Sequence, residues 1–137
     1  MIKPDGVSRG LSDEIIKRVE ESGLKVARKY QQQMQKDTAA ELYSIHQGKP
    51  FYNGLMKFIT SGPVICTIVE GEDAIVKLRE IMGATDPRAA AAGTIRGDLK
   101  EADIFTADKT IKNLVHGSDS SESAGREMAI FFKEGIK

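Results

Sequence analysis

The sequence predicts one α+β domain over residues 1–137, and two kinds of pattern support this fold class. Alternating apolar residues predict a strand at residues 24–34, and the most apolar stretch of the chain, residues 64–69, predicts a buried strand. Apolar residues at helical spacing predict helices before, between and after these strands. The order strand, helix, strand, helices, strand, helix, loop, strand, helix favours helices packed on one face of a sheet. A chain of 137 residues is long enough for one such domain.

The first predicted elements are a very short strand and a helix. Met1 and Ile2 have strand character, and the turn-forming residues 3–6 follow at once. Two residues are too few to fill a sheet position, so we expect the natural chain to begin upstream. The first helix is expected over residues 12–22, with Ser12 as its N-cap.

Three further helices and a long loop come next. Helical periodicity predicts helices over residues 37–46, 51–59 and 72–82. Residues 83–112 are irregular, with glycine, proline and an alanine run. A connection of this length inside a domain is usually functional.

A short strand and a helix complete the prediction. Residues 113–116 are apolar enough to form the strand, and the turn at residues 117–120 follows. Either Ser120 or Ser121 is expected to cap the last helix.

The charge balance limits the classes of binding partner. Lysine plus arginine is 20 and aspartate plus glutamate is 20, so the formal net charge is zero. A nucleic-acid coat or a polybasic membrane binder would need a large positive excess. We therefore expect neither nucleic acid nor a membrane as partner, although a local cationic pocket remains compatible with this total.

The cysteine count and hydropathy indicate the compartment. Cys66 is the single cysteine, which excludes an internal disulfide framework and a cysteine-rich zinc site. The most apolar stretch, residues 64–69, is far shorter than the ~20 residues of a spanning helix. The first residues lack the pattern of a signal peptide. We expect a soluble, cytoplasmic protein.

His116 is the first candidate catalytic residue. It ends a predicted strand just before a helix N-terminus, where unpaired N–H groups favour a phosphate. A neutral imidazole there could act as a nucleophile. Glu127, in the following helix, could bond the other ring nitrogen and fix the tautomer. The alternative is a histidine hydrogen-bonded at a sheet edge. His46, the other histidine, lies in a pattern typical of a surface or half-buried helical residue.

Three cations stand where a phosphate could be bound. The sequence has neither a GxxxxGK[ST] phosphate loop nor GxGxxG, so a nucleotide site must be built from side chains. Lys3 precedes a Pro-Asp-Gly turn, and Arg96 lies between Gly93 and Gly97, which would allow close approach to a ligand. Arginine matches phosphate oxygens as a bidentate donor. Taken alone, each of these cations is more often a solvated surface charge, and Arg79 in particular could belong only to the polar face of its predicted helix.

Taken together, five ordered motifs resemble the nucleoside diphosphate kinase family over residues 1 to about 132. The His-Gly-Ser-Asp motif with an upstream asparagine is the most specific of them. The motifs are Lys3-Pro4-Asp5-Gly6-Val7, Ser61-Gly62-Pro63-Val64, Gly83-Ala84-Thr85-Asp86-Pro87, Gly93-Thr94-Ile95-Arg96-Gly97-Asp98 and Asn113-Leu114-Val115-His116-Gly117-Ser118-Asp119-Ser120.

The resemblance implies a fold and an activity. The fold would be ferredoxin-like, with a four-stranded antiparallel sheet. The activity would be transfer of the γ-phosphate of a nucleoside triphosphate, typically ATP, to a nucleoside diphosphate, with Mg²⁺, by a ping-pong route through a phosphohistidine. Arginines and Mg²⁺ suit this chemistry because the transferring phosphoryl group spreads charge over its oxygens.

The resemblance also implies roles for individual residues. His116 would be the nucleophile, Glu127 would orient it and Ser118 would support Glu127. Asp119 would lie near the metal, through water. Stacking on Phe51 would be indifferent to the identity of the base. The phosphates and sugar would be lined by Lys3, Tyr43, Arg79, Thr85, Arg96 and Asn113.

The sequence departs from the family pattern between Asp98 and Asn113, where it carries several additional residues. Four charges at Lys100, Glu101, Asp103 and Asp108 indicate that the insertion around residues 100–109 is exposed. The family places a second apolar residue against the base just before the asparagine. Thr110 stands at that position here, and Ile111 or Phe105 could serve instead.

The resemblance further implies a homo-oligomer, a tetramer or hexamer built from dimers. The chain stops at Lys137, short of the tail that some members use between subunits, so the two assemblies remain alternatives.

Two other functions can be weighed against a kinase. A nucleotide-binding scaffold would be recognised by a substituted histidine, glutamate or arginine in the catalytic set, and none is substituted here. A nucleic-acid-binding protein would need a basic face beyond the pocket, against which the zero net charge argues.

Overall fold

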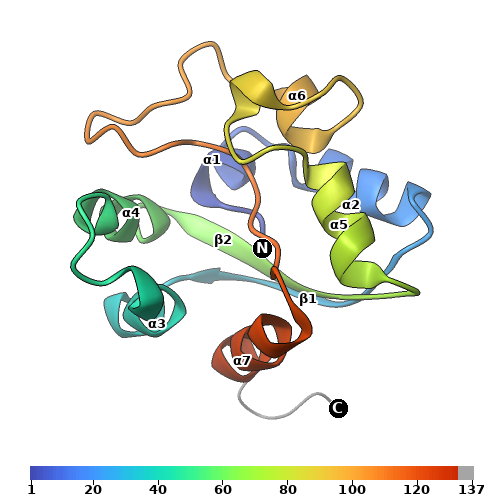
Figure 1. The fold of residues 1–137 in the computed structure, drawn as a ribbon, viewed down its shortest axis with the longest axis horizontal. Coiled ribbons are helices and arrows are strands. Elements are labelled where there is room, and N and C mark those ends of the chain that lie inside the picture. The colour runs from blue at the N-terminus through green and yellow to red at the C-terminus, as the bar shows by residue number, and fades with distance from the viewer. Residues whose placement is uncertain (133–137) are drawn as a thin grey trace.

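Two antiparallel strands, β1 (Lys25–Gln33) and β2 (Pro63–Glu70), lie at the centre of the fold. The computed structural model describes residues 1–132, and residues 133–137 of the expected domain lie outside the described part. The strands cross the middle of Figure 1, with α3 and α4 near one end and α2 and α5 near the other. The helices and 3-10 turns are α1 (Pro4–Ser8), α2 (Ser12–Glu21), α3 (Lys36–Leu42), η1 (Ser44–His46), α4 (Tyr52–Ile59), α5 (Ala74–Met82), η2 (Pro87–Ala89), α6 (Ile95–Leu99) and α7 (Ser121–Phe131).

The sheet extends beyond β2 only through single bridges. Ile2 bridges Ile65 of β2 on one side and Val115 on the other, so the spatial order is β1, β2, Ile2, Val115. The predicted α+β class with an antiparallel sheet is confirmed. Four full strands are not found among residues 1–132, and the strand expected at residues 113–116 is reduced to the bridge at Val115.

Leu114 explains why that strand does not form. Its φ of 72° is incompatible with an extended strand, and few residues other than glycine adopt it. Its backbone N–H donates to Oδ2 of Asp5 at 2.9 Å instead of to a strand neighbour. The buried carboxylate of Asp5 thus stabilises a bend directly before His116.

Both faces of the sheet are covered, so the prediction of one covered face is wrong. Val64, Cys66 and Ile68 of β2 belong to one apolar cluster, together with side chains of α3 and α4. Ile65, which points to the other face because strand residues alternate, packs against a second cluster. That cluster contains Ile2, Ile15, Met82, Ile95, Leu114 and Val115.

Two short helices were not predicted: α1 forms where a turn was expected, and α6 lies within the segment expected to be irregular. Helix boundaries also differ from the prediction at three places. Ser12 is the first residue of α2 rather than its N-cap, which is Leu11 without a side-chain bond. The helix expected through residue 46 ends at Leu42 and continues as the turn η1. The helix expected from residue 72 begins at Ala74, because Asp73 has a left-handed backbone with φ of 52°.

Other predicted features agree with the structure. Ser120 is the N-cap of α7, and its hydroxyl accepts the N–H of Ser123 at 3.1 Å. In the insertion, Lys100, Asp103 and Asp108 are exposed, whereas Glu101 is half-buried beside Lys112. Within residues 1–132, no helix is long and apolar enough to cross a membrane.

Candidate active site

Almost all the candidate residues line a single cleft. It has a volume of about 590 Å³ and lies between the α3–α4 region, the end of α5, the long loop and the segment that leads into α7. Of the eleven residues proposed from the sequence, ten line this cleft, and Ser118 lies behind it against Glu127. The ten are Lys3, Tyr43, Phe51, Arg79, Thr85, Arg96, Asn113, His116, Asp119 and Glu127.

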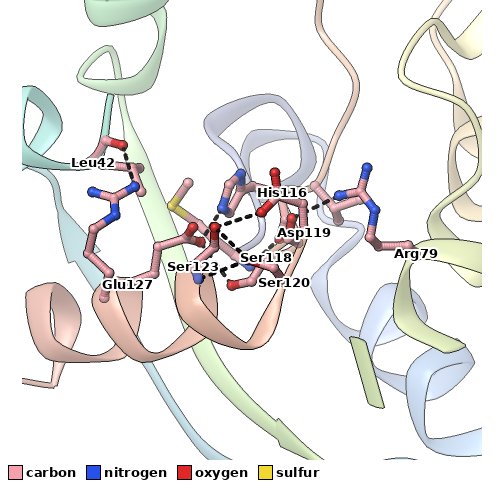
Figure 2. A network of polar contacts seen from close by, with 12 residues as sticks. Leu42, Arg79, His116, Ser118, Asp119, Ser120, Ser123 and Glu127 are labelled. Carbon is pink, nitrogen blue, oxygen red and sulfur yellow. Dashed lines mark hydrogen bonds and ion pairs between the residues drawn. The ribbon is translucent and has the colours of Figure 1, made fainter. Parts of the chain in front are cut away.

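His116 and Glu127 form the polar centre of the cleft. Figure 2 shows Glu127 on α7 reaching toward the ring of His116. The distance from Nε2 of His116 to Oε1 of Glu127 is 2.5 Å, and the hydroxyl of Ser118 donates to the same oxygen at 2.9 Å. A carboxylate accepts only, so Nε2 carries the proton and Nδ1 is left as the basic nitrogen of the neutral ring.

The charge states of this pair follow from burial and hydrogen bonding. Burial lowers the pKa of His116 and outweighs the hydrogen bond to Glu127, which raises it. Burial would raise the pKa of Glu127, but the hydrogen bonds from His116 and Ser118 hold that pKa below its usual value. At neutral pH the pair is therefore a neutral imidazole beside an ionised carboxylate, as a nitrogen nucleophile requires.

Lys3 and Arg96 form a buried cationic cluster around Asn113. Nζ of Lys3 donates to Oδ1 of Asn113 at 2.7 Å, and Nδ2 of Asn113 donates to the carbonyl of Thr85 at 3.0 Å. Burial, with a contribution from Arg96, lowers the pKa of Lys3 to about 8. Lys3 is thus protonated at neutral pH, in a region where an anion would offset its desolvation.

Arg96 is fixed by three backbone carbonyls. Its Nε donates to Asn113 at 3.0 Å, its Nη2 to Val115 at 2.7 Å and its Nη1 to Gly83 at 3.1 Å. A guanidinium has five N–H donors, so two remain for a ligand. Burial, followed by the nearby charge of Arg79, lowers the pKa of Arg96 to about 10, which leaves it charged at neutral pH.

The glycine after Arg96 has a different role from the one expected. A Cβ at Gly97 would lie 2.0 Å from the carbonyl oxygen of Ala91, so this glycine makes room for the protein backbone rather than for a ligand.

Arg79 approaches the same region from α5. Its Nη1 donates to the carbonyl of Gly117 at 3.2 Å, directly after His116 (Figure 2). A Cβ at Gly117 would lie 2.5 Å from Sδ of Met82, so the glycine allows this close packing of α5 against the His116 segment. Arg79 is therefore not a simple surface charge.

Aromatic residues occupy another part of the cleft. Phe51 is 50% exposed, and its ring stands edge to face with His46 at 5.3 Å between centroids. The hydroxyl of Tyr43 and Nδ1 of His46 are buried without a hydrogen-bond partner. Unpaired buried polar atoms are costly, so atoms of this kind in a cleft point to a polar ligand.

Asp119 is the candidate metal residue. Its carboxylate is exposed in the cleft, and the hydrogen bond from Ser123 lowers its pKa, so it is ionised. No group of three or more histidine, cysteine, aspartate or glutamate residues within residues 1–132 could hold a metal by itself. This arrangement fits Mg²⁺, which is usually bound by one or two carboxylates, waters and substrate phosphates.

Sequence reasoning missed several residues around the cleft. Asp5 holds the bend before His116, His46 contacts Phe51, and Arg126 lines the cleft while its guanidinium donates to the carbonyls of Glu41 and Leu42. The Pro-Asp-Gly turn was the available signal for Asp5. For His46, the available signal was its spacing of three residues from Tyr43, which places both on the same side of a predicted helix.

The three alternatives for the residue on the second side of the base, Thr110, Ile111 and Phe105, all line the cleft.

Comparison with protein families gives an independent result. The family model described as nucleoside diphosphate kinase matches residues 1–136. A nucleoside diphosphate kinase of Saccharolobus solfataricus is 48% identical over 132 residues, which cover 96% of this chain and 91% of that protein. One of Desulforamulus reducens is 49% identical over 133 residues, 97% of this chain and 85% of that protein.

Solved structures similar to this chain belong to the same family. A halophilic nucleoside diphosphate kinase from Halobacterium salinarum in complex with CDP is similar with a TM-score of 0.87 and 44% identity, covering 96% of this chain and 83% of that one. A transition state mimic of the Borrelia burgdorferi nucleoside-diphosphate kinase, with bound vanadate and ADP, has a TM-score of 0.88 and 33% identity, covering 99% of this chain and 88% of that one. The family predicted from the motifs is thus confirmed, and the chain belongs to the nucleoside diphosphate kinase family.

Proposed function

We propose that this protein transfers the γ-phosphate of a nucleoside triphosphate to a nucleoside diphosphate in two steps through phosphorylated His116. The observation that carries the proposal is the bond from Nε2 of His116 to Glu127, because it leaves Nδ1 as the free nucleophilic nitrogen of a residue that lines the cleft. The family assignment supports the same reaction.

In the first step, the lone pair of Nδ1 attacks the γ-phosphorus in line with the leaving oxygen. The P–N bond forms while the bond from the γ-phosphorus to the β–γ bridging oxygen breaks, and the nucleoside diphosphate leaves with that electron pair. The proton on Nε2 stays in place. Glu127 stabilises the positive charge that develops on the ring. A different nucleoside diphosphate then takes the phosphoryl group by the reverse of these events.

The cations of the cleft act on the charge of the phosphates. Lys3, Arg79 and Arg96 converge near His116, and preorganised donors are most effective where charge develops in the transition state. Thr85 and Asn113 are assigned to the phosphates and sugar, and Tyr43 supplies an unpaired hydroxyl.

The base and the metal have their own residues. Phe51 is proposed to stack on the base with little regard to its identity. Mg²⁺ would be held by the nucleotide phosphates and, through water, by Asp119. The bound ion would supply charge neutralisation on the phosphates.

We extend the proposal to the sheet, the assembly and the location. The segments at Ile2 and Val115 correspond to the outer part of a four-stranded ferredoxin-like sheet, an assignment supported by their bridges. A tetramer or hexamer built from dimers follows from the family resemblance, and we retain the cytoplasmic location expected from the sequence. The buried thiol of Cys66 is consistent with a reducing compartment.

A phosphoenzyme assay tests the function. Incubation with Mg-ATP labelled in the γ-phosphate should give an acid-labile, base-stable phosphoprotein that added GDP discharges. His116→Ala should give no label and still bind ADP, since the imidazole attacks rather than anchors. Stable label in His116→Ala, or no label in the unaltered protein, would refute the mechanism.

A further inference from the structure

The insertion forms an ordered turn of its own. The N–H of Lys112 donates to Ile104 at 2.6 Å, and the N–H of Thr106 donates to Thr110 at 2.9 Å. Phe105 and Ile111 pair in a β-bridge. Ile104 is 3% exposed and fixes the base of the turn in the protein. These contacts close residues 104–112 into a hairpin-like loop with a defined tip.

The tip of this loop lies directly against α4. Gly54, within α4, has no side chain, and a Cβ built there would be 2.5 Å from Oγ1 of Thr110 and 3.5 Å from Cβ of Asp108. Nζ of Lys57, one helical turn later, pairs with Oδ2 of Asp108 at 3.1 Å. In Figure 1 the orange segment reaches over α4. Glycine destabilises a helix relative to alanine, and at this position it leaves the space that the loop tip occupies.

This contact joins two sides of the candidate nucleotide cleft. Phe51 and Leu55 belong to the α4 side, whereas Phe105, Thr110 and Ile111 belong to the inserted loop, and all five line the cleft. The distance between the two sides is therefore fixed before any ligand binds. A site that is already ordered loses less conformational entropy on binding.

We propose that Gly54 and the tip of the inserted loop, residues 108–110, are positioning residues for the nucleotide. The docked loop keeps the aromatic part of the cleft at the width that a nucleoside needs. The loop can dock this closely because Gly54 has no Cβ to strike its tip. This inference rests on the proposed function, because it deepens the assignment of the same cleft. It predicts an effect on nucleotide affinity that is separate from the phosphoryl transfer step.

Gly54→Ala is the direct test, with Gly125→Ala as its matched control. Gly125 lies in α7 with nothing within 4 Å of an added Cβ, so alanine fits there without a clash. For Gly54→Ala we expect the Kd of ADP, measured by calorimetry, and the KM to rise roughly fivefold or more, while kcat at saturation stays within about twofold. Gly125→Ala should leave all three constants unchanged.

Thr110→Ala shows whether the loss of nucleotide affinity in Gly54→Ala is caused by displacement of the loop. This substitution removes the Oγ1 that an alanine at position 54 would strike, so adding Gly54→Ala to it should cost little further affinity. Unchanged Kd and KM in Gly54→Ala, or an equal loss in both backgrounds, would overturn the proposal.

A charge reversal keeps the test decisive if Gly54→Ala does not fold. The side chains of Lys57 and Asp108 are 74% and 46% exposed, so Asp108→Lys should fold normally. It should weaken ADP binding by up to about fivefold at low salt, and the exchange Lys57→Asp with Asp108→Lys should restore binding. No weakening, or no restoration, would contradict the docked loop. The calorimetric readout needs no turnover, so a protein that binds ADP without forming phosphohistidine would refute only the proposed function.

Discussion

Replacing Glu127 by glutamine removes one charge from the centre of the cleft with almost no change in shape. Oε1 of Glu127 accepts two hydrogen bonds, at 2.5 Å from His116 and at 2.9 Å from Ser118. Hydrogen bonds to a charged group contribute roughly 1.5–3 kcal/mol, against about 1 kcal/mol for a neutral pair. Losing the charge should therefore cost about 1–2 kcal/mol, which corresponds to a roughly 5- to 30-fold slower phosphorylation of His116.

The glutamine also affects proton placement. Its amide can present either an acceptor or a donor to Nε2 of His116, and a donor would place the ring proton on Nδ1, where it blocks attack. In addition, the hydrogen bond to Glu127 raises the pKa of His116. Without that charge the pKa of His116 falls further, so the acid limb of the rate profile should move to lower pH.

The assay is single-turnover quench of the variant with γ-labelled Mg-ATP across pH. Glu122→Gln is the matched control, because Glu122 lies exposed in the first turn of the same helix, outside the cleft. Ser118→Ala keeps the carboxylate charge beside His116. The Ser118 hydrogen bond is present both before and during transfer, so its loss should raise the barrier by less than its full contribution, and we expect a smaller loss of rate than for Glu127→Gln. A Glu127→Gln rate equal to that of the unaltered protein, or no lower than that of Ser118→Ala, would refute the electrostatic role of Glu127.

Two further predictions concern pH and stability. Because burial lowers the pKa of Lys3 from 10.5 to about 8, kcat/KM should fall as pH rises above about 8 and the ammonium group loses its proton. The unfolded chain binds more protons between these two pKa values, so the free energy of unfolding should rise with pH in the same window, and a profile flat to pH 10 in both would contradict this. Ile59 is 0% exposed, so Ile59→Ala should lower the free energy of unfolding in urea by about 2–5 kcal/mol, whereas Val76→Ala, at a site 58% exposed, should change it by less than about 0.5 kcal/mol. Equal losses in the two variants would show that burial does not set the cost.

Local patterns were sufficient for the two strands and the longer helices, but not for the short helices α1 and α6. The apolar run at residues 64–69 predicted β2, and the serine before a helical run predicted the cap of α7, because hydropathy and capping are properties of neighbouring residues. The strand at residues 113–116 could not be judged in this way. Its interruption depends on Asp5, which lies far away in the sequence and accepts the N–H of Leu114.

The inserted loop also makes a contact that local sequence patterns cannot predict. Its charges correctly indicated exposure for most of it, but nothing local to residues 100–109 predicts a contact with α4. From the sequence alone, Gly54 indicates only a residue that destabilises its helix relative to alanine. Its role appears once the loop tip is placed against it.

The sequence by itself determined which residue types are present and in what order, and for this chain that was enough to identify the family and to propose His116 as the nucleophile. Only the tertiary structure decided which nitrogen of His116 is basic, since this depends on Glu127 reaching Nε2 across a turn and a helix. It also decided that Lys3 meets Asn113, 110 residues away, and that burial lowers the pKa of this lysine to about 8. The physical reason is that pKa, tautomer and cleft shape depend on distances and on exclusion of water, which long-range packing sets.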